Sequence, residues 1–332
     1  VLDSAAASHM AVAEAMTNIT AADIDPALVK LSANWMAACG AEGEDAKLFA
    51  AVKAASEYCQ ALNVSIPVGK DSCSMRTAWD DKDEKKCVTS PVSLIVSAAA
   101  PVGNVRLTLT PLLRTDKPSV LALFDLSGGR ARMGASILAQ VAQSFGDTAP
   151  DAPDAQKLVR FVKLIRKLTL AGCVTAYHDR SDGGLAATLS EMMFASHVGL
   201  DVTLDGLIDG AKDVEAATAA LFNEEIGAVV QIPADRLEDV KSQAAAAGLS
   251  DCLFVVARIN TTDTFKVTCG ENVLVDEKRT DLMRVWSEVS HEIARGRDNP
   301  ACADSELEVA CGTDHQGLFV KTTFDPEEHP SG

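Results

Sequence analysis

The chain has 332 residues, of which 47% are hydrophobic and 23% charged, and a formal net charge of −17 at pH 7. A chain of this length can bury a large core and is expected to form two domains. Its acidic charge argues against nucleic acid and anionic membranes as partners, because both bind basic surfaces. The longest apolar run, near residues 92–102, is too short to cross a bilayer.

The N-terminus has neither an initiator Met nor a basic segment before an apolar one, so no signal peptide is expected. The chain starts within an Ala-rich helical pattern, which suggests an excerpt of a longer protein. Its nine cysteines include no C-x-x-C pair and are expected to be reduced thiols of a cytoplasmic protein. None has the flanking glycines of a nucleophile elbow, so thiol catalysis is not expected.

The first half of the chain predicts a mixed domain of helices and strands over residues 1–110. Its periodicity predicts a helix at 4–19, a strand at 28–36, a helix at 43–62, a short strand at 63–72, a charged hairpin tip at 79–86 and a buried strand at 90–102. The apolar pattern breaks between residues 104 and 118, where a domain boundary is expected.

The second half alternates strands with helices, which predicts a layered α/β domain over residues 111–296. The tail 297–332, with its Pro, Glu, His and Gly residues, is expected to be a linker. The predicted elements are strands at 119–126, 173–179, 199–204, 227–232, 253–259 and 264–268, and helices at 134–146, 155–170, 184–197, 212–223, 234–247 and 279–296.

The stretch "HDRSDGG" joins a predicted strand to a predicted helix and concentrates charge at that turn. One interpretation is that Ser181 or Asp182 simply caps the helix. The other is a ligand site at the carboxyl end of a strand, where Gly183 and Gly184 let backbone amides approach an anion. Asp179 and Asp182 would repel phosphate directly, but Mg²⁺ would bind both the carboxylates and the phosphate oxygens.

Magnesium needs further oxygen ligands, and Glu14 and Asn18 lie four residues apart on one helix face. Such a pair is usually solvated and is a candidate only together with other ligands. Lys70, in "VGKDS", lacks the earlier glycine of a P-loop and is either a phosphate-neutralising or a surface lysine. Weaker candidates are the polar cluster at residues 223–225, with Glu224 and Glu225, and the Gly/Arg segment at 125–136.

Several long stretches together resemble the formylglycinamide ribonucleotide amidotransferase family, also called phosphoribosylformylglycinamidine synthases, of the large multidomain type. They are "LDSAAASHMAVAEAMTNI", "KLSANWMAACGAEGEDAKLFAAVKA", "IPVGKDSCSM", "TSPVSLIVSA", "HDRSDGGLAATLSEMMFA", "ALFNEEIGAVVQI" and "RDNPACADSE". The resemblance covers nearly the whole chain and corresponds to the second synthetase half of that family. It implies an α+β and α/β fold like that of aminoimidazole ribonucleotide synthetase. A partial N-terminal mixed-sheet domain would precede a C-terminal three-layer α/β domain.

The family converts formylglycinamide ribonucleotide, ATP and glutamine, as ammonia donor, to formylglycinamidine ribonucleotide in purine biosynthesis. By resemblance, Glu14, Asn18 and Asp179 are Mg²⁺ ligands, and Ser181 contacts ATP or ADP. The resemblance also implies that an N-terminal synthetase half, a glutaminase domain and a further metal-binding Asp lie outside this chain.

Because the family has two related nucleotide sites, two roles are open for this half: a catalytic one, or a structural one that holds a nucleotide without turnover. A selenophosphate synthetase or a thiamine-phosphate kinase is a more distant alternative.

Overall fold

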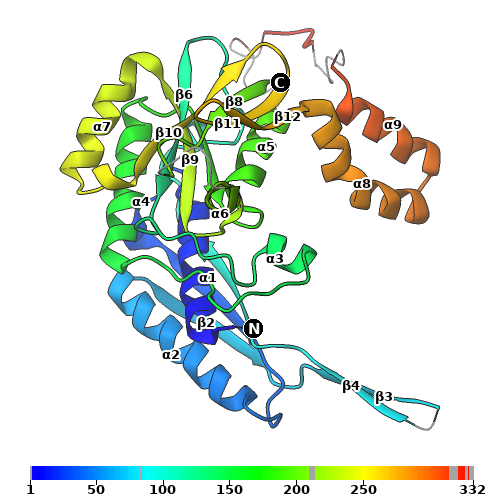
Figure 1. Ribbon diagram of the computed structural model, residues 1–332. Coiled ribbons are helices and arrows are strands. Elements are labelled where there is room, and N and C mark those ends of the chain that lie inside the picture. Colours follow the sequence, from blue (N-terminus) through cyan, green and yellow to red (C-terminus); the bar gives the residue numbers. More distant parts are fainter. Residues whose placement is uncertain (1, 83, 209–213, 314–320, 326–327, 329–332) are drawn as a thin grey trace. The chain divides into compact units, whose positions relative to one another are not determined.

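The computed structural model describes residues 2–82, 84–208, 214–313, 321–325 and 328 (Figure 1). Contacts divide the chain into two compact units, Val1–Glu277 and Lys278–Gly332. The boundary predicted near residue 110 lies inside the first unit and stays a prediction. None of the described helices has an apolar stretch long enough to span a membrane.

The N-terminal part of the first unit is a small mixed sheet in the order β2-β1-β5, together with two helices and a separate hairpin. Strand β1 pairs in parallel with β2 and antiparallel with β5. The elements are α1 (Ser4–Ile19), β1 (Lys30–Met36), α2 (Glu44–Leu62), β2 (Ser65–Ser72), the hairpin β3 (Arg76–Asp81) and β4 (Glu84–Thr89), and β5 (Ser93–Ala99).

Helix α1 connects this small sheet to the rest of the unit. It begins where the Asp3 carboxylate accepts hydrogen bonds from the amides of Ala5 and Ala6, both at 2.9 Å. It packs against α2, β5 and β7, and the Tyr177 hydroxyl on β7 donates to the Thr17 carbonyl oxygen at 2.7 Å. The face of α1 that carries Glu14 is thereby held beside the end of β7.

The C-terminal part of the first unit is a seven-stranded sheet in the order β12-β11-β8-β10-β6-β9-β7. Its strands are β6 (Ser119–Asp125), β7 (Ala176–Arg180), β8 (Gly199–Thr203), β9 (Gly227–Pro233), β10 (Leu253–Asn260), β11 (Thr264–Cys269) and β12 (Asn272–Lys278). Its helices are α3 (Ile137–Val141), α4 (Ala155–Leu170), α5 (Gly184–Ser196), α6 (Val214–Phe222) and α7 (Leu237–Ala246).

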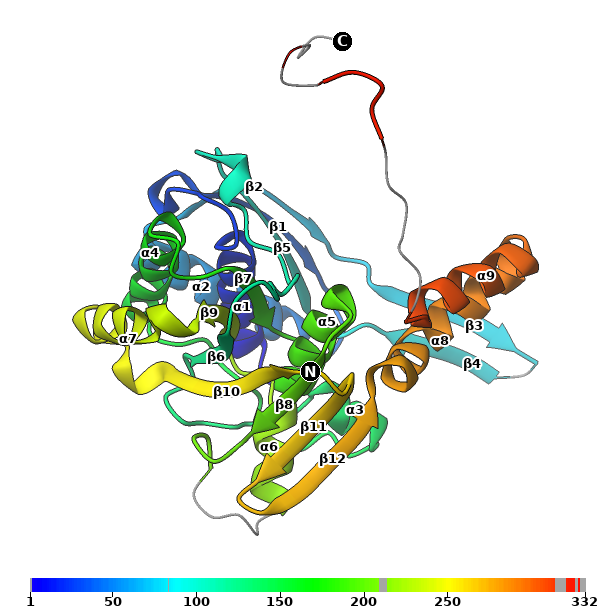
Figure 2. The same ribbon diagram turned by 90° about the horizontal axis from the view of Figure 1, so that it is seen from above.

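Helices cover both faces of the seven-stranded sheet. Alternate residues of β6 point to opposite sides, and Phe124 packs on Phe161 of α4 with ring centroids 5.6 Å apart. Leu121 and Leu123 are buried on the other side, where α5 packs against β7, β8 and α6. Figures 1 and 2 show α4 and α7 on one face and α5 and α6 on the other. The predicted three-layer α/β fold is therefore confirmed.

Several predicted elements of the first unit are wrong in length or environment. The helix predicted at 134–146 is only Ile137–Val141, because Ala135 and Gln143 have left-handed backbones, φ 61° and 53°, that end it on both sides. The strand predicted as buried at 90–102 is β5, which leaves Ile95 54% exposed. Strand β12 was not predicted. Helix α6 begins at Val214, and residues 212–213 of its prediction lie outside the described ones.

The second unit contains two helices, α8 (Arg279–Arg297) and α9 (Pro300–Cys311). Helix α8 was predicted, but α9 lies in the segment expected to be a linker. Proline is favourable at the first position of a helix, and Asn299 caps α9 in front of Pro300. The helices are joined by ion pairs such as Arg295 Nε to Asp304 Oδ1 at 2.7 Å. The predicted tail is thus helical at its start, and part of its remainder lies outside the described residues.

Candidate functional site

The "HDRSDGG" turn lies between the end of β7 and the start of α5. Gly183 and Gly184 both have left-handed backbones, with φ 79° and 65°. A Cβ on Gly184 would lie 2.6 Å from the carbonyl oxygen of Asn223 and 2.8 Å from that of Leu221. The second glycine therefore lets the turn pack against the backbone at the end of α6.

The capping interpretation of this turn is wrong. The N-cap residue of α5 is Gly183, and no side chain makes the capping hydrogen bond. The Gly183 amide instead donates to Glu224 Oε1 at 2.9 Å, an oxygen that also accepts the Ile137 amide at 2.8 Å. The side chains of Ser181 and Asp182 are therefore not used to begin the helix.

A pocket of about 270 Å³ opens beside the turn. It brings together residues of α1, the loop around α3, the β7–α5 turn and the segment before β9. Its lining residues are Leu2, Asp3, Ala7, Met10, Ala11, Glu14, Gly134, Ala135, Ala149, Pro150, Arg180, Ser181, Asp182, Glu224 and Ile226. Two predicted site residues, Glu14 and Ser181, thus line one pocket although they are far apart in the sequence.

Carboxylates gather around Glu14. Partial burial raises the pKa of the Glu14 carboxyl, and the negative charges of Asp179, Asp182 and Glu224 raise it further. Burial also raises the pKa of Glu224; the hydrogen bonds from Ile137 and Gly183 oppose that rise, and the charge of Asp182 adds to it. Four acidic side chains thus repel one another here, an arrangement that a divalent cation would relieve.

The Asp179 carboxylate is paired with His178, whose Nδ1 lies 3.4 Å from Asp179 Oδ1. The other ring nitrogen, Nε2, lies 2.9 Å from Glu191 Oε2. Burial alone would lower the pKa of His178, but the hydrogen bonds and charges of Asp179 and Glu191 raise it to about 9. At neutral pH the protonated His178 ring therefore forms ion pairs with the carboxylates of Asp179 and Glu191. Its positive charge compensates part of the negative charge of Asp179.

The predicted metal ligands are brought together in part. Asp179 is near enough for its charge to raise the pKa of Glu14, and Asn18 is exposed one turn further along α1. Neither Asp179 nor Asn18 is among the residues that line the pocket. Within the described residues, no group of three or more His, Cys, Asp or Glu side chains is arranged to hold a metal ion by itself. Two carboxylates and an amide fit magnesium as an incomplete set, to which phosphate oxygens or water would add. The ligand assignments stay predictions.

Lys70 is exposed on β2, where its ammonium group donates to Ser72 Oγ at 2.8 Å. It is not among the residues that line the pocket at the turn. Its predicted contact with phosphate stays a prediction.

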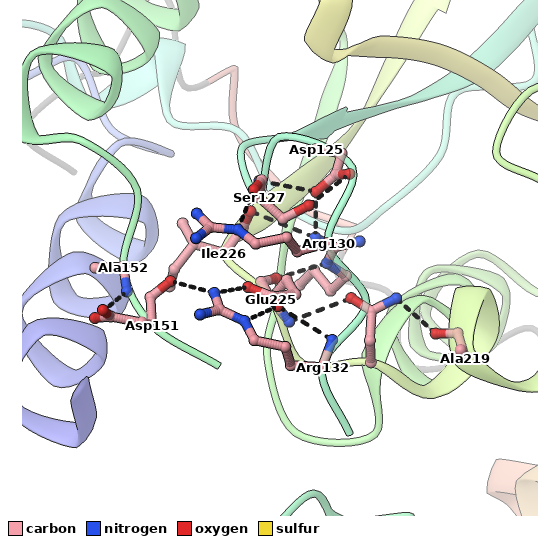
Figure 3. A network of polar contacts seen from close by, with 11 residues as sticks. Asp125, Ser127, Arg130, Arg132, Asp151, Ala152, Ala219, Glu225 and Ile226 are labelled. Carbon is pink, nitrogen blue, oxygen red and sulfur yellow. Dashed lines mark hydrogen bonds and ion pairs between the residues drawn. The ribbon is translucent and has the colours of Figure 1, made fainter. Parts of the chain in front are cut away.

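Two ion pairs, Arg132–Glu225 and Arg180–Asp125, lie next to this region, and Figure 3 labels the first pair together with Asp125. Glu225 is fully buried and accepts from Arg132 Nε at 2.6 Å and from Arg132 Nη2 at 2.8 Å. Arg180 donates to Asp125 Oδ1 at 2.7 Å and, through Nε, to the Glu225 carbonyl oxygen at 2.6 Å. A Cβ on Gly227 would lie 2.6 Å from the Phe124 carbonyl oxygen and 3.3 Å from Arg180 Nη2.

These two ion pairs connect segments that the sequence indicated only as weak candidates for the site. The sequence analysis did not predict that the segments pair with each other. Asp125, Arg132 and Glu225 belong to the two weaker candidate segments, and Arg180 lies within "HDRSDGG" but was given no role of its own. The available signal was charge complementarity: oppositely charged residues lie where the buried strands β6, β7 and β9 begin or end. Because Arg132 is paired with Glu225, it supports the structure and is not free to bind phosphate.

Two domain families match the chain. Residues 1–101 match the FGAR-AT PurM_N-like domain, and residues 124–270 match the C-terminal domain of AIR synthase related proteins. These matches agree with the predicted partial N-terminal domain and C-terminal α/β domain, and they confirm an AIR synthase-like fold.

Solved structures with the same fold belong to more than one kind of protein. T. maritima PurL complexed with FGAR has a TM-score of 0.61 at 15% identity, over 85% of this chain and 43% of that one. T. maritima PurL complexed with ATP has a TM-score of 0.55 at 14% identity, over 82% and 40%. E. coli HypE, a hydrogenase maturation protein, has a TM-score of 0.57 at 17% identity, over 81% and 78%. The chain thus spans about two fifths of the PurL chains.

Proposed function

We propose that this chain, a member of the AIR synthase-like superfamily, is the second synthetase half of a formylglycinamide ribonucleotide amidotransferase of the large multidomain type. The complete ligase would convert formylglycinamide ribonucleotide, ATP and glutamine to formylglycinamidine ribonucleotide, ADP, phosphate and glutamate, in the purine biosynthesis of the cytoplasm. The match of residues 1–101 to a domain named for FGAR-AT supports this choice. The part assigned to this chain is the binding of a magnesium nucleotide, ATP or ADP.

The observation that carries the proposal is the group of carboxylates beside an uncapped helix start. Asp179 and Asp182 raise the pKa of Glu14, while neither Ser181 nor Asp182 caps α5. A group of acids whose charges raise one another's pKa is typical of a site that receives a cation. The adjacent Ser181 hydroxyl, which lines the pocket, is suited to a phosphate oxygen.

Each residue then has a role that follows from its position. Glu14, Asn18 and Asp179 would hold Mg²⁺, which neutralises phosphate charge when it is bound. Ser181 would donate a hydrogen bond from its hydroxyl group to a phosphate oxygen. Because Gly183 and Gly184 have no side chains, the phosphate would approach the backbone of the turn closely. His178 would orient the Asp179 carboxylate, because its Nδ1 lies 3.4 Å from Asp179 Oδ1.

The proposed partners are the N-terminal synthetase half and the glutaminase domain of the same protein. In the first unit, one face of the small sheet carries exposed apolar side chains, and we assign the docking of such a partner to this face. Val68 and Ile95 are 62% and 54% exposed there, and the register places both on the face of Ser32 and Asn34. A half that is docked in a larger enzyme would keep these side chains from water.

A structural role without turnover is the second candidate. Arg180, which lines the pocket, is held by Asp125, and Arg132 nearby is held by Glu225, so neither is free to stabilise charge that moves during a phosphoryl transfer. A nucleotide held in such a pocket would stabilise the protein and leave the chemistry to the other half.

Turnover by the full-length protein separates these roles. Asp179→Asn should abolish formylglycinamidine formation if this pocket is catalytic. If the pocket is structural, turnover should persist while the thermal stability and the amount of co-purified nucleotide fall. Asp239→Asn, which changes an exposed ion pair with Arg236, is the matched control. Failure of the full-length protein to bind formylglycinamide ribonucleotide would overturn the family assignment and leave the fold shared with HypE.

A further inference from the structure

Two cysteines outside the nucleotide pocket lie opposite each other. Ala38 and Ser74 form an isolated antiparallel bridge between the turn before α2 and the segment after β2. The next residues outward are Cys39 and Cys73, and the Cys39 amide donates to the Cys73 carbonyl oxygen at 2.9 Å. Directly opposed residues of an antiparallel pair have Cα atoms about 5.5 Å apart, which lies within the range of disulfides.

Both thiols are free and exposed. Cys73 Sγ donates to Asp71 Oδ2 at 2.9 Å. Hydrogen bonding to Asp71, and then to the Cys39 thiol, raises the pKa of Cys73 to about 12. Cys73 therefore stays protonated at neutral pH, and its reaction requires the loss of this proton to solvent. Gly40, with φ 83°, sets the tight turn that presents Cys39.

We propose that Cys39 and Cys73 are a redox-active pair that closes to a disulfide by exchange with a small-molecule disulfide such as oxidised glutathione. The Cys39 thiolate attacks one sulfur of the oxidant, forms a mixed disulfide and releases one glutathione thiolate. Cys73 then loses its proton to water, attacks the Cys39 sulfur and expels the second glutathione as its thiolate. The two protein thiols lose two electrons and two protons, and the oxidant is reduced to two thiols.

The disulfide would connect two segments that are otherwise joined by backbone hydrogen bonds. It would fix the turn before α2 to the end of β2, the strand that carries Lys70. This site does not depend on the proposed nucleotide function.

Cys87 provides an internal comparison. It is exposed on β4, and Arg76 Nε donates to its Sγ at 2.8 Å. Hydrogen bonding to Arg76 lowers the pKa of Cys87, which makes its thiolate available. Cys87 is expected to accept glutathione as a lasting mixed disulfide, because no second thiol is placed opposite it: Ala78 is its partner in the hairpin.

The test is a redox titration of the whole chain. The reduced protein is equilibrated with mixtures of reduced and oxidised glutathione, alkylated and digested with trypsin. The tryptic peptides 31–47, 71–76 and 87–106 each contain one of the three cysteines, so a linkage is assigned by mass. We expect peptides 31–47 and 71–76 to be linked, with a loss of two hydrogen atoms. The ratio of linked to reduced protein should rise in proportion to the concentration of oxidised glutathione divided by the square of that of reduced glutathione, as for an intramolecular disulfide.

The variants separate pairing from independent reaction. Cys73→Ser should leave Cys39 as a glutathione adduct, Cys39→Ser should leave Cys73 unmodified, and Cys87→Ser should not change the linkage. Serine at these exposed positions is not expected to affect folding, which circular dichroism checks. The proposal is overturned if Cys39 and Cys73 take up glutathione independently, or if no linked peptide forms at any mixture.

Discussion

The buried pair between Arg132 and Glu225 gives the sharpest prediction for stability. Glu225→Gln keeps the shape of the side chain but removes its charge, and it places an amide group against one of the guanidinium nitrogens now bound at 2.6 and 2.8 Å. Breaking a buried ion pair on one side costs about 3–5 kcal/mol. Because the Arg132 side chain is 17% exposed and water reaches it in part, we expect about 3 kcal/mol.

Urea unfolding measures this cost. With a slope of about 3 kcal/mol/M, the midpoint of Glu225→Gln should fall by about 1 M. The control is Asp239→Asn, which removes an exposed pair with Arg236 whose side chains are 57% and 49% exposed. Exposed pairs contribute about 0–1 kcal/mol, so that midpoint should hardly move. Equal shifts in the two variants would refute the structural role given to the Arg132–Glu225 pair.

Three further predictions follow from single contacts. Gly227→Ala should lower the free energy of unfolding by about 1–3 kcal/mol, because its Cβ would lie 2.6 Å from the Phe124 carbonyl oxygen. The control Gly296→Ala in α8, with nothing within 4 Å, should stabilise or be neutral in the same urea assay. The pKa of His178 is raised from 6.5 to about 9, so its protonation contributes up to about 3 kcal/mol to the free energy of unfolding. This contribution is fully present below pH 6.5 and is lost as the pH rises through 9. The stability difference between wild type and His178→Gln should shrink over that window, and a constant difference would contradict it. Ile95→Ser should reduce self-association in sedimentation if this face of the small sheet is a docking surface, and an unchanged monomer in both proteins would count against that surface.

The sequence predicted the elements whose apolar residues follow a regular period. Helices α2 and α4 bury one face, and strands β6 and β9 are buried on both sides, so both kinds of pattern are visible in the letters. Helix α3 was overestimated, because nothing in "GASILAQVAQSFG" shows that Ala135 and Gln143 take left-handed backbones. Strand β12 has a largely exposed surface and therefore lacks an apolar period.

The candidate site was predictable only as separate pieces. The charge density of "HDRSDGG" and the glycines after it identified the turn, and the pocket places Glu14 beside it. The Glu224 contact that satisfies the Gly183 amide joins residues 41 positions apart, and the Arg132–Glu225 pair joins residues 93 apart. Contacts at such separations depend on how the layers pack, which one sequence does not reveal.

The central claim is that the carboxylates around Glu14 make a magnesium-dependent nucleotide site. It is tested most directly by calorimetric titration of ADP into this chain, with Mg²⁺ or with EDTA, for the wild type, Asp179→Asn and the control Asp239→Asn. The account predicts binding to the wild type and the control with Mg²⁺, no binding with EDTA, and an affinity lowered by about tenfold or more, ~1.4 kcal/mol, in Asp179→Asn. Equal affinity with and without Mg²⁺, or an unchanged affinity in Asp179→Asn, would contradict it.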